Sequence, residues 1–198
     1  MRIGSILENQ KIEKRIAITP EIVKKYISLG FKISLSENYG SHLGIKDKDY
    51  VEMGANITKD DKEILSTSDI ILQLGMLAEE KSSLLKDSQV LIGVLDPYNN
   101  KQKLEDLAKK NINIFSLELL PRITRAQSMD ILSSQANLAG YKAVIESFAF
   151  FEKAVPMMMT AAGTVPAAKV LVVGVGVAGL QAIATAKRMG AIVFGTDV

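Results

Sequence analysis

The sequence predicts an α/β protein built from two parallel-sheet subdomains, and two features of the chain carry this prediction. Up to about Leu120, short apolar runs alternate with amphipathic stretches, a spacing typical of parallel strands joined by helices. Near the C-terminus, residues 169–173 form a continuous run of leucine and β-branched side chains, the pattern of a buried parallel strand. A glycine-rich turn and a further helical pattern follow that run.

The apolar runs of the first subdomain give its strands in order. The predicted strands are residues 2–7, 15–18, 32–36, 70–74, 89–94 and 112–116. Residues 20–29 predict a helix, because Thr19 is a suitable N-cap, Pro20 suits the first helical position and Gly30 suits a left-handed C-cap. Residues 101–110 predict a second helix with one apolar face.

The middle of the chain predicts a long helix. A break at residues 121–124 precedes the proline-free stretch 126–153, which carries small residues that would let another backbone approach closely: Ala136, Ala139, Gly140 and Ala143. Residues 157–164 are predicted as a loop between two prolines. The chain is therefore divided into an N-terminal subdomain (residues 1–120), a connecting segment with the long helix (121–155) and the start of a second subdomain (156–198).

The composition excludes several classes of function. The chain has 24 Lys+Arg and 22 Asp+Glu, and basic and acidic residues alternate along residues 101–110, so no nucleic-acid partner is expected. It has no cysteine, which excludes disulfides, thiolate nucleophiles and thiolate metal sites. No stretch approaches the roughly 18 apolar residues that a membrane-spanning helix needs, and we expect the chain to be soluble.

Three glycines directly after residues 169–173 form a G-x-G-x-x-G motif. Alone the motif is a weak signal, but here it lies between a predicted strand and a predicted helix (180–189), and a second predicted strand (191–196) ends at an aspartate. This context predicts the dinucleotide-binding turn of a Rossmann-like fold. The predicted cofactor-binding residues of this segment are Gly174, Gly176, Val177, Ala178, Gly179, Asp197 and Val198.

Each residue of the motif has its own expected role. Gly174 allows the tight turn, Gly176 lets backbone N–H groups approach a pyrophosphate, and Gly179 lets the helix pack closely on the strand. Asp197 would accept hydrogen bonds from the adenosine ribose and repel a 2′-phosphate, which favours NAD(H) over NADP(H). The alternative is a glycine-rich turn that serves only packing, with Asp197 as a surface residue.

The chain resembles the NAD(H)-binding domain of the alpha subunit of proton-translocating nicotinamide nucleotide transhydrogenases. The resemblance is strongest at residues 118–130 and 133–141, continues through residues 156–164 and includes the glycine motif. Residues 14–21 and 38–57 are also similar to this family and to its relative, alanine dehydrogenase. The similarity is diffuse only between about residues 59 and 110.

The resemblance implies a fold, a reaction and partners. The fold is a pair of Rossmann-like subdomains, and the reaction is hydride transfer between NAD(H) on this subunit and NADP(H) on a partner domain, coupled to proton translocation. The expected partners are a second copy in a homodimer and the membrane-spanning and NADP(H)-binding subunits. The expected location is peripheral, on the cytoplasmic side of the inner membrane of a bacterium.

The resemblance also implies a polar cluster at the nicotinamide end, formed by Arg122, Gln127, Asp130 and Ser133. Gln127 and Ser133 would hold the carboxamide and ribose, and Arg122 and Asp130 would form an ion pair. Direct hydride transfer needs no acid or base from the protein, only two rings held face to face away from water. The alternative is that these four side chains lie on a helix surface with no role.

Departures from the alanine dehydrogenase branch favour the transhydrogenase interpretation. That branch uses a lysine after the strand matching residues 70–74 and a histidine after the strand matching residues 89–95. The corresponding residues here are 73–76, Gln-Leu-Gly-Met, and 94–97, Val-Leu-Asp-Pro. Arg15 alone supplies no proton-transfer group for imine chemistry. An alanine dehydrogenase-like enzyme therefore remains the less favoured alternative.

The extent of the second subdomain gives one further expectation. Only one βαβ unit is predicted after the long helix, so the second Rossmann-like subdomain is expected to be truncated. Two parallel strands with one crossover helix bury little apolar surface. We therefore expect the chain alone to bind NAD(H) weakly and to catalyse no transhydrogenation alone, and a non-catalytic remnant stays an open alternative.

Overall fold

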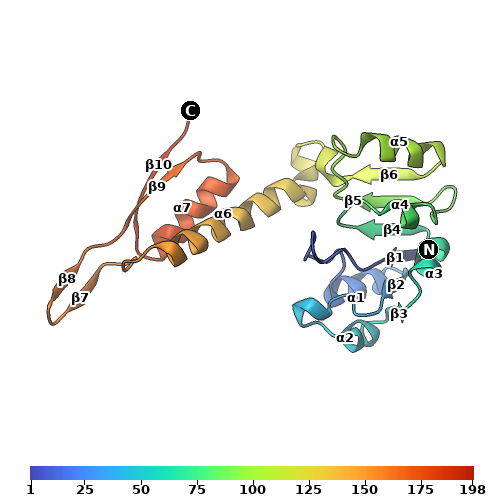
Figure 1. Ribbon diagram of the computed structural model, residues 1–198, viewed down its shortest axis with the longest axis horizontal. Coiled ribbons are helices and arrows are strands. Elements are labelled where there is room, and N and C mark those ends of the chain that lie inside the picture. Colours follow the sequence, from blue (N-terminus) through green and yellow to red (C-terminus); the bar gives the residue numbers. More distant parts are fainter. The chain divides into compact units, whose positions relative to one another are not determined.

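A computed structural model describes all residues, 1–198, as two compact units (Figure 1). Unit 1 is Met1–Pro121 and unit 2 is Arg122–Val198. Unit 1 is a six-stranded sheet with helices, and unit 2 joins a long helix to a small sheet and a hairpin. None of the helices combines the length and the apolar character needed to cross a bilayer.

The sheet of unit 1 is entirely parallel. Its strands are β1 (Arg2–Ser5), β2 (Lys32–Ser36), β3 (Asn56–Thr58), β4 (Ile70–Gln73), β5 (Val90–Gly93) and β6 (Asn113–Ser116). Their spatial order is β3-β2-β1-β4-β5-β6, and Ile3 of β1 pairs with Ile33 on one side and Ile70 on the other. The chain therefore reverses its direction of progress between β1 and β4, which is the topological switch point of this doubly wound sheet.

Five helices and one short 3₁₀ turn connect these strands, and a second 3₁₀ turn follows β6. The helices are α1 (Pro20–Ser28), α2 (Asp47–Glu52), α3 (Asp61–Thr67), α4 (Glu79–Ser82) and α5 (Lys101–Lys109), and the turns are Ser41–Leu43 and Leu117–Leu119. Pro20 begins α1, and the Asp60 carboxylate accepts a hydrogen bond from Lys62 N–H at the start of α3. Gly30 has a φ of 86°, as a left-handed residue after a helix requires.

Unit 1 buries two well-populated apolar clusters. One gathers around β4 and β5 and consists of Ile6, Ile64, Leu65, Ile71, Leu77, Leu85, Leu91, Leu95, Leu107 and Ile112. The other gathers around β1 and β2 and consists of Ile3, Ile18, Val23, Ile33, Leu35, Tyr39, Tyr50 and Ala55. These clusters fix the sheet and thus the loops at the carboxyl ends of its strands.

Unit 2 begins with a 3₁₀ turn at Thr124–Met129 and the long helix α6 (Ile131–Phe150). An antiparallel hairpin of β7 (Met158–Thr160) and β8 (Gly163–Val165) follows, and Figure 1 shows it extending away from the helices of this unit. The chain ends with β9 (Lys169–Val173), α7 (Val177–Arg188) and β10 (Ile192–Thr196). Strands β9 and β10 pair in parallel, from Lys169 with Ile192 to Val173 with Thr196.

The core of unit 2 is small. Only Val144, Ala182, Ala186 and Ala191 form its buried cluster. Helices α6 and α7 cross so closely at Gly140 that a Cβ there would meet the Ala178 carbonyl oxygen at 2.0 Å. The expectation that small residues on the long helix admit another backbone is confirmed at Gly140.

The predicted α/β fold with two parallel sheets is confirmed, but several local predictions are wrong. Residues 15–18 form no strand: Ala17 N–H donates to the Tyr39 hydroxyl at 3.1 Å, and the apolar side chains pack on the second cluster. The long helix starts at Ile131 rather than residue 126, because Asp130 caps it. The stretch predicted as a loop contains the β7–β8 hairpin, where Gly163 has a φ of 131°.

The burial predicted for residues 169–173 is also wrong. Strand β9 alternates, so that Val170 and Val172 pack against the small core while Leu171 and Val173 are 66% and 79% exposed. Ile192 and Phe194 of β10 are exposed as well. The continuous apolar run therefore marks a strand with an uncovered apolar face in this structure.

Candidate functional site

The turn between β9 and α7 has the geometry predicted from its glycines. Gly174 has a φ of 90°, and its N–H donates to the Thr196 carbonyl oxygen at 2.8 Å. Gly176 is the N-cap of α7, and its carbonyl oxygen accepts the Leu180 N–H at 2.8 Å. The chain thus turns from strand to helix within three residues, as a phosphate-binding turn requires.

Gly179 is required for a different reason. A Cβ at this position would lie 1.8 Å from the Gly174 carbonyl oxygen, so only glycine fits beneath the turn. Gly140 of α6 lies against Ala178, the residue before Gly179 in α7. The glycine turn is therefore held from below by its own helix and by α6.

The upper side of the turn is open. A Cβ built on Gly174 or Gly176 would meet no atom within 4 Å, and no side chain caps the first turn of α7. The backbone N–H groups of Val177 and Ala178 lie in that first turn, where a helix leaves its donors without internal partners. These donors and the positive end of the helix dipole fit a pyrophosphate, so the residues present suit a dinucleotide.

A hollow of about 370 Å³ lies over this turn. Its walls come from the glycine turn and from the first half of α6, and they are Arg122, Leu132, Ser133, Ala136, Gly174, Gly176, Val177, Ala178 and Gly179. Two segments of unit 2 that are distant in sequence thus line one hollow. Ala136 was predicted only as a small packing residue, and no motif marks Leu132.

Asp197 directly follows β10 and folds back onto the turn. Its Oδ2 accepts a hydrogen bond from Val175 N–H at 2.5 Å, and its Oδ1 accepts one from Val198 N–H at 2.7 Å. These backbone hydrogen bonds, that of Val175 foremost, lower the pKa of Asp197. An ionised carboxylate accepts about four hydrogen bonds, so acceptor capacity remains for ligand hydroxyl groups.

Asp130 and Ser133 form one local unit at the start of α6. The Asp130 carboxylate accepts Ser133 N–H at 3.0 Å and the Ser133 hydroxyl at 2.6 Å. The hydroxyl hydrogen bond is the main cause of a lowered pKa at Asp130, and the more distant charge of Arg122 contributes. The ion pair expected between Arg122 and Asp130 is not formed. Asp130 instead caps the N-terminus of α6 and accepts the hydroxyl hydrogen bond of Ser133.

Arg122 and Gln127 are both exposed at the start of unit 2. A second hollow, of about 280 Å³, is lined by Arg122, Ile123, Thr124, Ala126, Gln127 and Asp130. Arg122 lines both hollows, so three of the four predicted polar residues lie around the second hollow and Ser133 lies in the first. Of the four predicted polar residues, Arg122 and Ser133 therefore line the hollow of the glycine turn, while Gln127 and Asp130 line the neighbouring hollow that shares Arg122.

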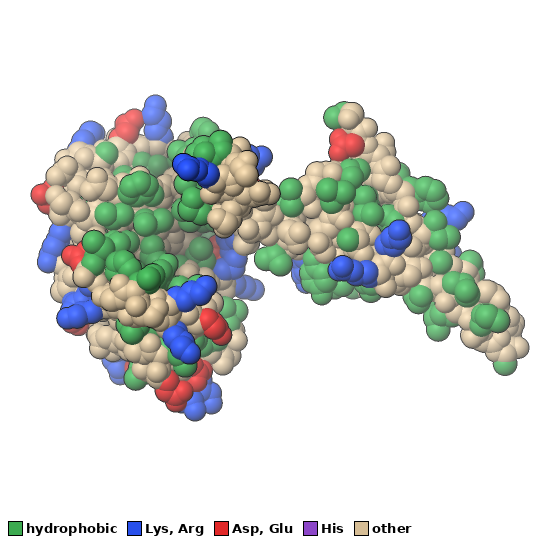
Figure 2. All heavy atoms as spheres, turned by 180° about the vertical axis from the view of Figure 1, so that it is seen from behind, with side chains coloured by type: hydrophobic (Ala, Val, Ile, Leu, Met, Phe, Trp, Pro, Cys, Tyr) green, Lys and Arg blue, Asp and Glu red, His purple; other side chains and the backbone are tan.

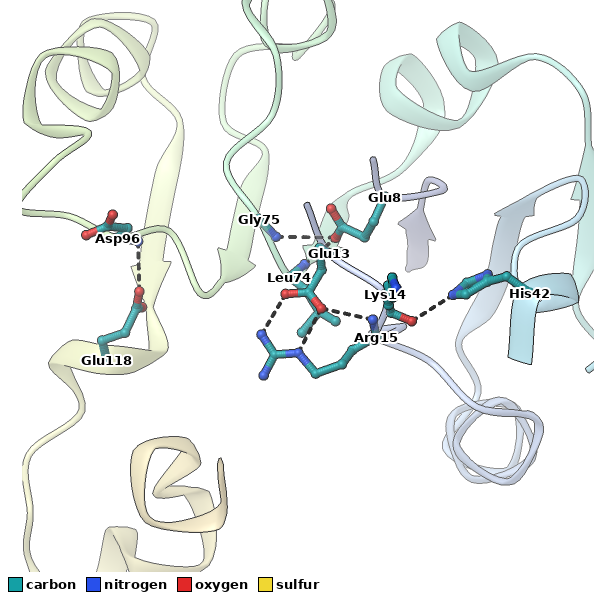
Figure 3. Close-up of polar contacts among 9 residues, drawn as sticks. All are labelled: Glu8, Glu13, Lys14, Arg15, His42, Leu74, Gly75, Asp96 and Glu118. Atoms are coloured by element: carbon teal, nitrogen blue, oxygen red, sulfur yellow. Dashed lines mark hydrogen bonds and ion pairs between the residues drawn. The ribbon is translucent and has the colours of Figure 1, made fainter. Parts of the chain in front are cut away.

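Unit 1 has its own polar groups at the carboxyl ends of β4 and β5 (Figure 3). After β4, the N–H groups of Leu74 and Gly75 donate to Oε1 of Glu8 at 2.6 and 3.3 Å. After β5, Asp96 N–H donates to Oε1 of Glu118 at 2.7 Å. The strand ends of unit 1 are thus capped by carboxylates of the chain itself, a pairing that no sequence spacing reveals.

Two family models match the chain. The model described as the N-terminal domain of alanine dehydrogenase/PNT matches residues 5–139, and the model of the C-terminal domain matches residues 143–198. The chain is also similar along its whole length to proteins named as the first portion of NAD(P) transhydrogenase subunit alpha. The protein of Rickettsia prowazekii is 48% identical and that of Rhodospirillum rubrum 50% identical, and the chain covers 53% of each.

A solved structure gives the same picture. The transhydrogenase of Sinorhizobium meliloti matches all of this chain with a TM-score of 0.94 and 46% identity, and 59% of that chain is covered. The chain thus spans about half the length of the curated relatives it matches. With both family models matched in order over residues 5–139 and 143–198, this chain belongs to the alanine dehydrogenase/PNT family.

Proposed function

We propose that this chain is the NAD(H)-binding component of a proton-translocating transhydrogenase, which transfers hydride between NAD(H) bound here and NADP(H) bound on a partner domain. The observation that carries the proposal is the open glycine turn at the N-terminus of α7, with the polar start of α6 beside it. The similarity to transhydrogenase alpha subunits over the whole chain supports it.

The residues around the glycine turn bind the pyrophosphate and the adenosine half of the dinucleotide. The N–H groups of Val177 and Ala178 bind the pyrophosphate, and Asp197 with Val198 meets the adenosine ribose. Because a carboxylate repels a 2′-phosphate, Asp197 selects NAD(H) over NADP(H). Bound NAD(H) supplies the hydride or accepts it, and the protein contributes position and exclusion of water.

At the other end of the dinucleotide, the polar residues of unit 2 orient the nicotinamide. Gln127 and Ser133 hold its carboxamide and ribose, and Arg122 balances the charge around the reacting ring. Asp130 positions Ser133, because its carboxylate accepts both the backbone N–H and the hydroxyl of that residue. We assign these nicotinamide contacts to the connecting segment, residues 121–155, and the pyrophosphate and adenosine contacts to a dinucleotide-binding subdomain that begins at residue 156; residues 1–120 form the N-terminal subdomain.

The assembly follows from the same proposal. The chain forms a homodimer and works with a membrane-spanning subunit and an NADP(H)-binding subunit, at the cytoplasmic side of the inner membrane. The exposed methionines of the hairpin region, Met157, Met158 and Met159, and the exposed face of β9 and β10 are consistent with covering by other protein surfaces. Figure 2 shows hydrophobic side chains along the hairpin of unit 2.

An amino-acid dehydrogenase is the less favoured function. Residues 73–76 at the end of β4 and 94–97 after β5 supply neither a lysine nor a histidine for proton transfer to an imine. Their backbone N–H groups at Leu74, Gly75 and Asp96 bind carboxylates of the chain instead. Assaying the chain with alanine or pyruvate and NAD(H) would reveal that activity.

The proposal is tested by fluorescence titration of NADH and NADPH against the chain. Gly176→Ala should weaken NADH binding by roughly tenfold without unfolding the chain, since its φ of −70° suits alanine and the new methyl enters the phosphate path. Gly75→Ala in unit 1 is the matched control, because its new Cβ lies at an ordinary 3.4 Å from the nearest atom. Equal NADH affinity of the wild type and Gly176→Ala would remove the turn from the binding site.

The same titration tests the nucleotide preference. Asp197→Asn keeps an acceptor for Val175 N–H but loses the charge, so NADPH should gain affinity relative to NADH. Absence of any NADH binding by the wild-type chain would instead favour a non-catalytic protein.

A further inference from the structure

A hollow at the switch point of the sheet of unit 1 is not used by the proposed function. It has a volume of about 520 Å³ and lies where the segments that leave β1 and β4 diverge. In doubly wound sheets this is the place where ligands bind, because the loops on its two sides leave the sheet in opposite directions. Its apolar wall is formed by Ile6, Leu7, Ile12, Met76, Leu77 and Ala78.

Glu8 gives this hollow its chemical character. It lies in the segment after β1 and is partly buried. Its Oε1 accepts hydrogen bonds from the N–H groups of both Leu74 and Gly75 (Figure 3). Oε2 points past Gly75, whose Cβ would lie 3.4 Å from it, and keeps capacity to accept hydrogen bonds. The two backbone donors that could have held an anion are therefore occupied, and the hollow offers a carboxylate in their place.

The other charged groups around the hollow are largely balanced. Asp61 is paired with Lys81 at 2.9 Å and accepts the Ser36 hydroxyl at 2.6 Å. Lys103 lies on α5 at the exposed rim, where water screens its charge. Outside the lining, Glu13 is paired with Arg15 at 2.6 Å. Glu8 itself forms no ion pair, although a hydrogen bond from the Gln73 side chain and the charge of Arg15 also act on it, and it is the anionic group of the inner wall.

The segment between β1 and α1 adds an uncovered apolar side chain. Ile12 lines the hollow yet remains 84% exposed. Its segment is held by the Glu13–Arg15 pair and by the hydrogen bond of 2.7 Å between His42 Nε2 and the Lys14 carbonyl oxygen. An apolar ligand in the hollow would let Ile12 bury surface that is now in contact with water.

We propose that this hollow binds small aliphatic ammonium compounds, with the ammonium group on Glu8 and the alkyl group against the apolar wall. The site is independent of the dinucleotide site of unit 2. An ammonium group donates to the open Glu8 oxygen and is attracted by its charge, and burial of the alkyl group supplies the remaining affinity. A carboxylate or phosphate ligand would face Glu8 with like charge and find no free backbone donor.

The test is an NMR titration of the ¹⁵N-labelled 198-residue chain with n-butylammonium chloride, followed through backbone amide shifts. The expected result is saturable binding in the millimolar range, with shifts confined to residues 6–12 and 73–78. Sodium butyrate and n-butanol, which share the alkyl group but carry a negative charge or none, should bind much more weakly. Similar binding of all three would overturn the proposal.

Variants sharpen the test. Glu8→Gln keeps an acceptor for Leu74 and Gly75 and should weaken n-butylammonium binding by roughly tenfold, as loss of a charge-assisted hydrogen bond predicts. Glu79→Gln removes an exposed carboxylate of α4 that does not line the hollow, and should leave binding unchanged. Unchanged binding in Glu8→Gln would overturn the assignment. If that variant does not fold, the comparison of the three probes still decides.

NADH titration separates this proposal from the function proposed above. Glu8→Gln should bind NADH as the wild type does, because Glu8 belongs to unit 1 and the glycine turn to unit 2. Lost ammonium binding with retained NADH binding is therefore the expected pattern for this variant.

Discussion

Both units contain parallel strands joined by helices, but they differ in how many of their apolar side chains are buried. Unit 1 buries ten apolar residues in one cluster and eight in the other, whereas the buried cluster of unit 2 has four members, three of them alanines. The apolar residues of unit 2 are exposed instead, as Leu171, Val173 and Phe194 show. Stability therefore resides mainly in unit 1, and the glycine turn proposed to bind NAD(H) lies in the less covered unit.

The strand ends of the two units differ in polarity as well. In unit 1 the backbone N–H groups after β4 and β5 are satisfied by Glu8 and Glu118. In unit 2 Asp197 caps only the Val175 N–H, and the first turn of α7 remains open. Similar secondary structure thus leaves backbone donors occupied in unit 1 and open in unit 2, and the difference comes from a few carboxylates.

The largest expected effect comes from one leucine substitution in each unit, which tests the difference in apolar burial. Leu91→Ala in β5 removes a side chain with 0% exposure, and should lower the free energy of unfolding of unit 1 by about 2–5 kcal/mol. Leu171→Ala in β9 removes a side chain that is 66% exposed, and should change stability by less than about 0.5 kcal/mol. Denaturant unfolding measures both, and equal losses would break the comparison.

A second prediction concerns the small core of unit 2. Gly140→Ala places a methyl group against the Ala178 carbonyl oxygen, so α6 and α7 must separate, at a cost of about 1–3 kcal/mol. Hydrogen exchange should then quicken in α6, α7 and β9 while unit 1 keeps its protection. Ala139→Val adds bulk at an exposed position of the same helix and serves as control. Quickened exchange in unit 1 would show that the units are not separate in stability.

A smaller effect distinguishes the two carboxylate caps by their pH dependence. Burial raises the pKa of Glu8, although the backbone hydrogen bond of Leu74 opposes it, so its ionised form destabilises the fold. Stability of the wild type relative to Glu8→Gln should therefore fall as pH rises from the ordinary glutamate pKa through the raised one.

Glu118 should show the opposite sign. Burial alone would raise its pKa, but hydrogen bonds from the Ser116 hydroxyl and from the Asp96 and Leu95 N–H groups lower it overall. Its contribution is present above the ordinary glutamate pKa and is lost as pH falls through the lowered one. Unfolding curves of the wild type, Glu8→Gln and Glu118→Gln across this pH range measure both slopes, and slopes of the same sign would contradict the assignment.

The weakest expected effect tests the polarity difference with a simple anion. Pyrophosphate added to the ¹⁵N-labelled chain should shift the amides of residues 176–180, because the first turn of α7 presents open donors. The amides of Leu74, Gly75 and Asp96 should not move, since carboxylates already occupy them. Added salt should weaken the shifts in unit 2. Shifts in unit 1 of equal size would remove the proposed contrast.

The sequence predicted most where the signal is local. The strand, glycine turn, helix and second strand of residues 169–196 appear in the structure with nearly the predicted bounds, because each glycine has a steric reason that the motif states. In unit 1 the strands β1, β2, β4, β5 and β6 match predicted apolar runs, whereas β3 was not predicted. Boundaries failed where a side chain competed with the backbone pattern, as Asp130 does at the start of α6.

What the sequence could not give depends on neighbours distant in the chain. Residues 15–18 have a strand-like pattern, yet Tyr39 takes the Ala17 N–H and no strand pairs with them. The burial of residues 169–173 depends on which elements cover both faces, and α7 covers one. The pairing of Glu8 with Leu74 joins residues 66 apart, and no local spacing predicts it.

The contact of Gly140 with Ala178 has a mechanical consequence. Ser133 stands before Gly140 on α6, about 10 Å along the axis of one continuous helix. The backbones of α6 and α7 touch at Gly140 without an intervening side chain. The Ser133 hydroxyl on α6 and the glycine turn before α7 are therefore held rigidly relative to each other. A ligand bound at its phosphates would thus have its other end positioned near Ser133 by this rigid helix contact. No loop would have to close over it.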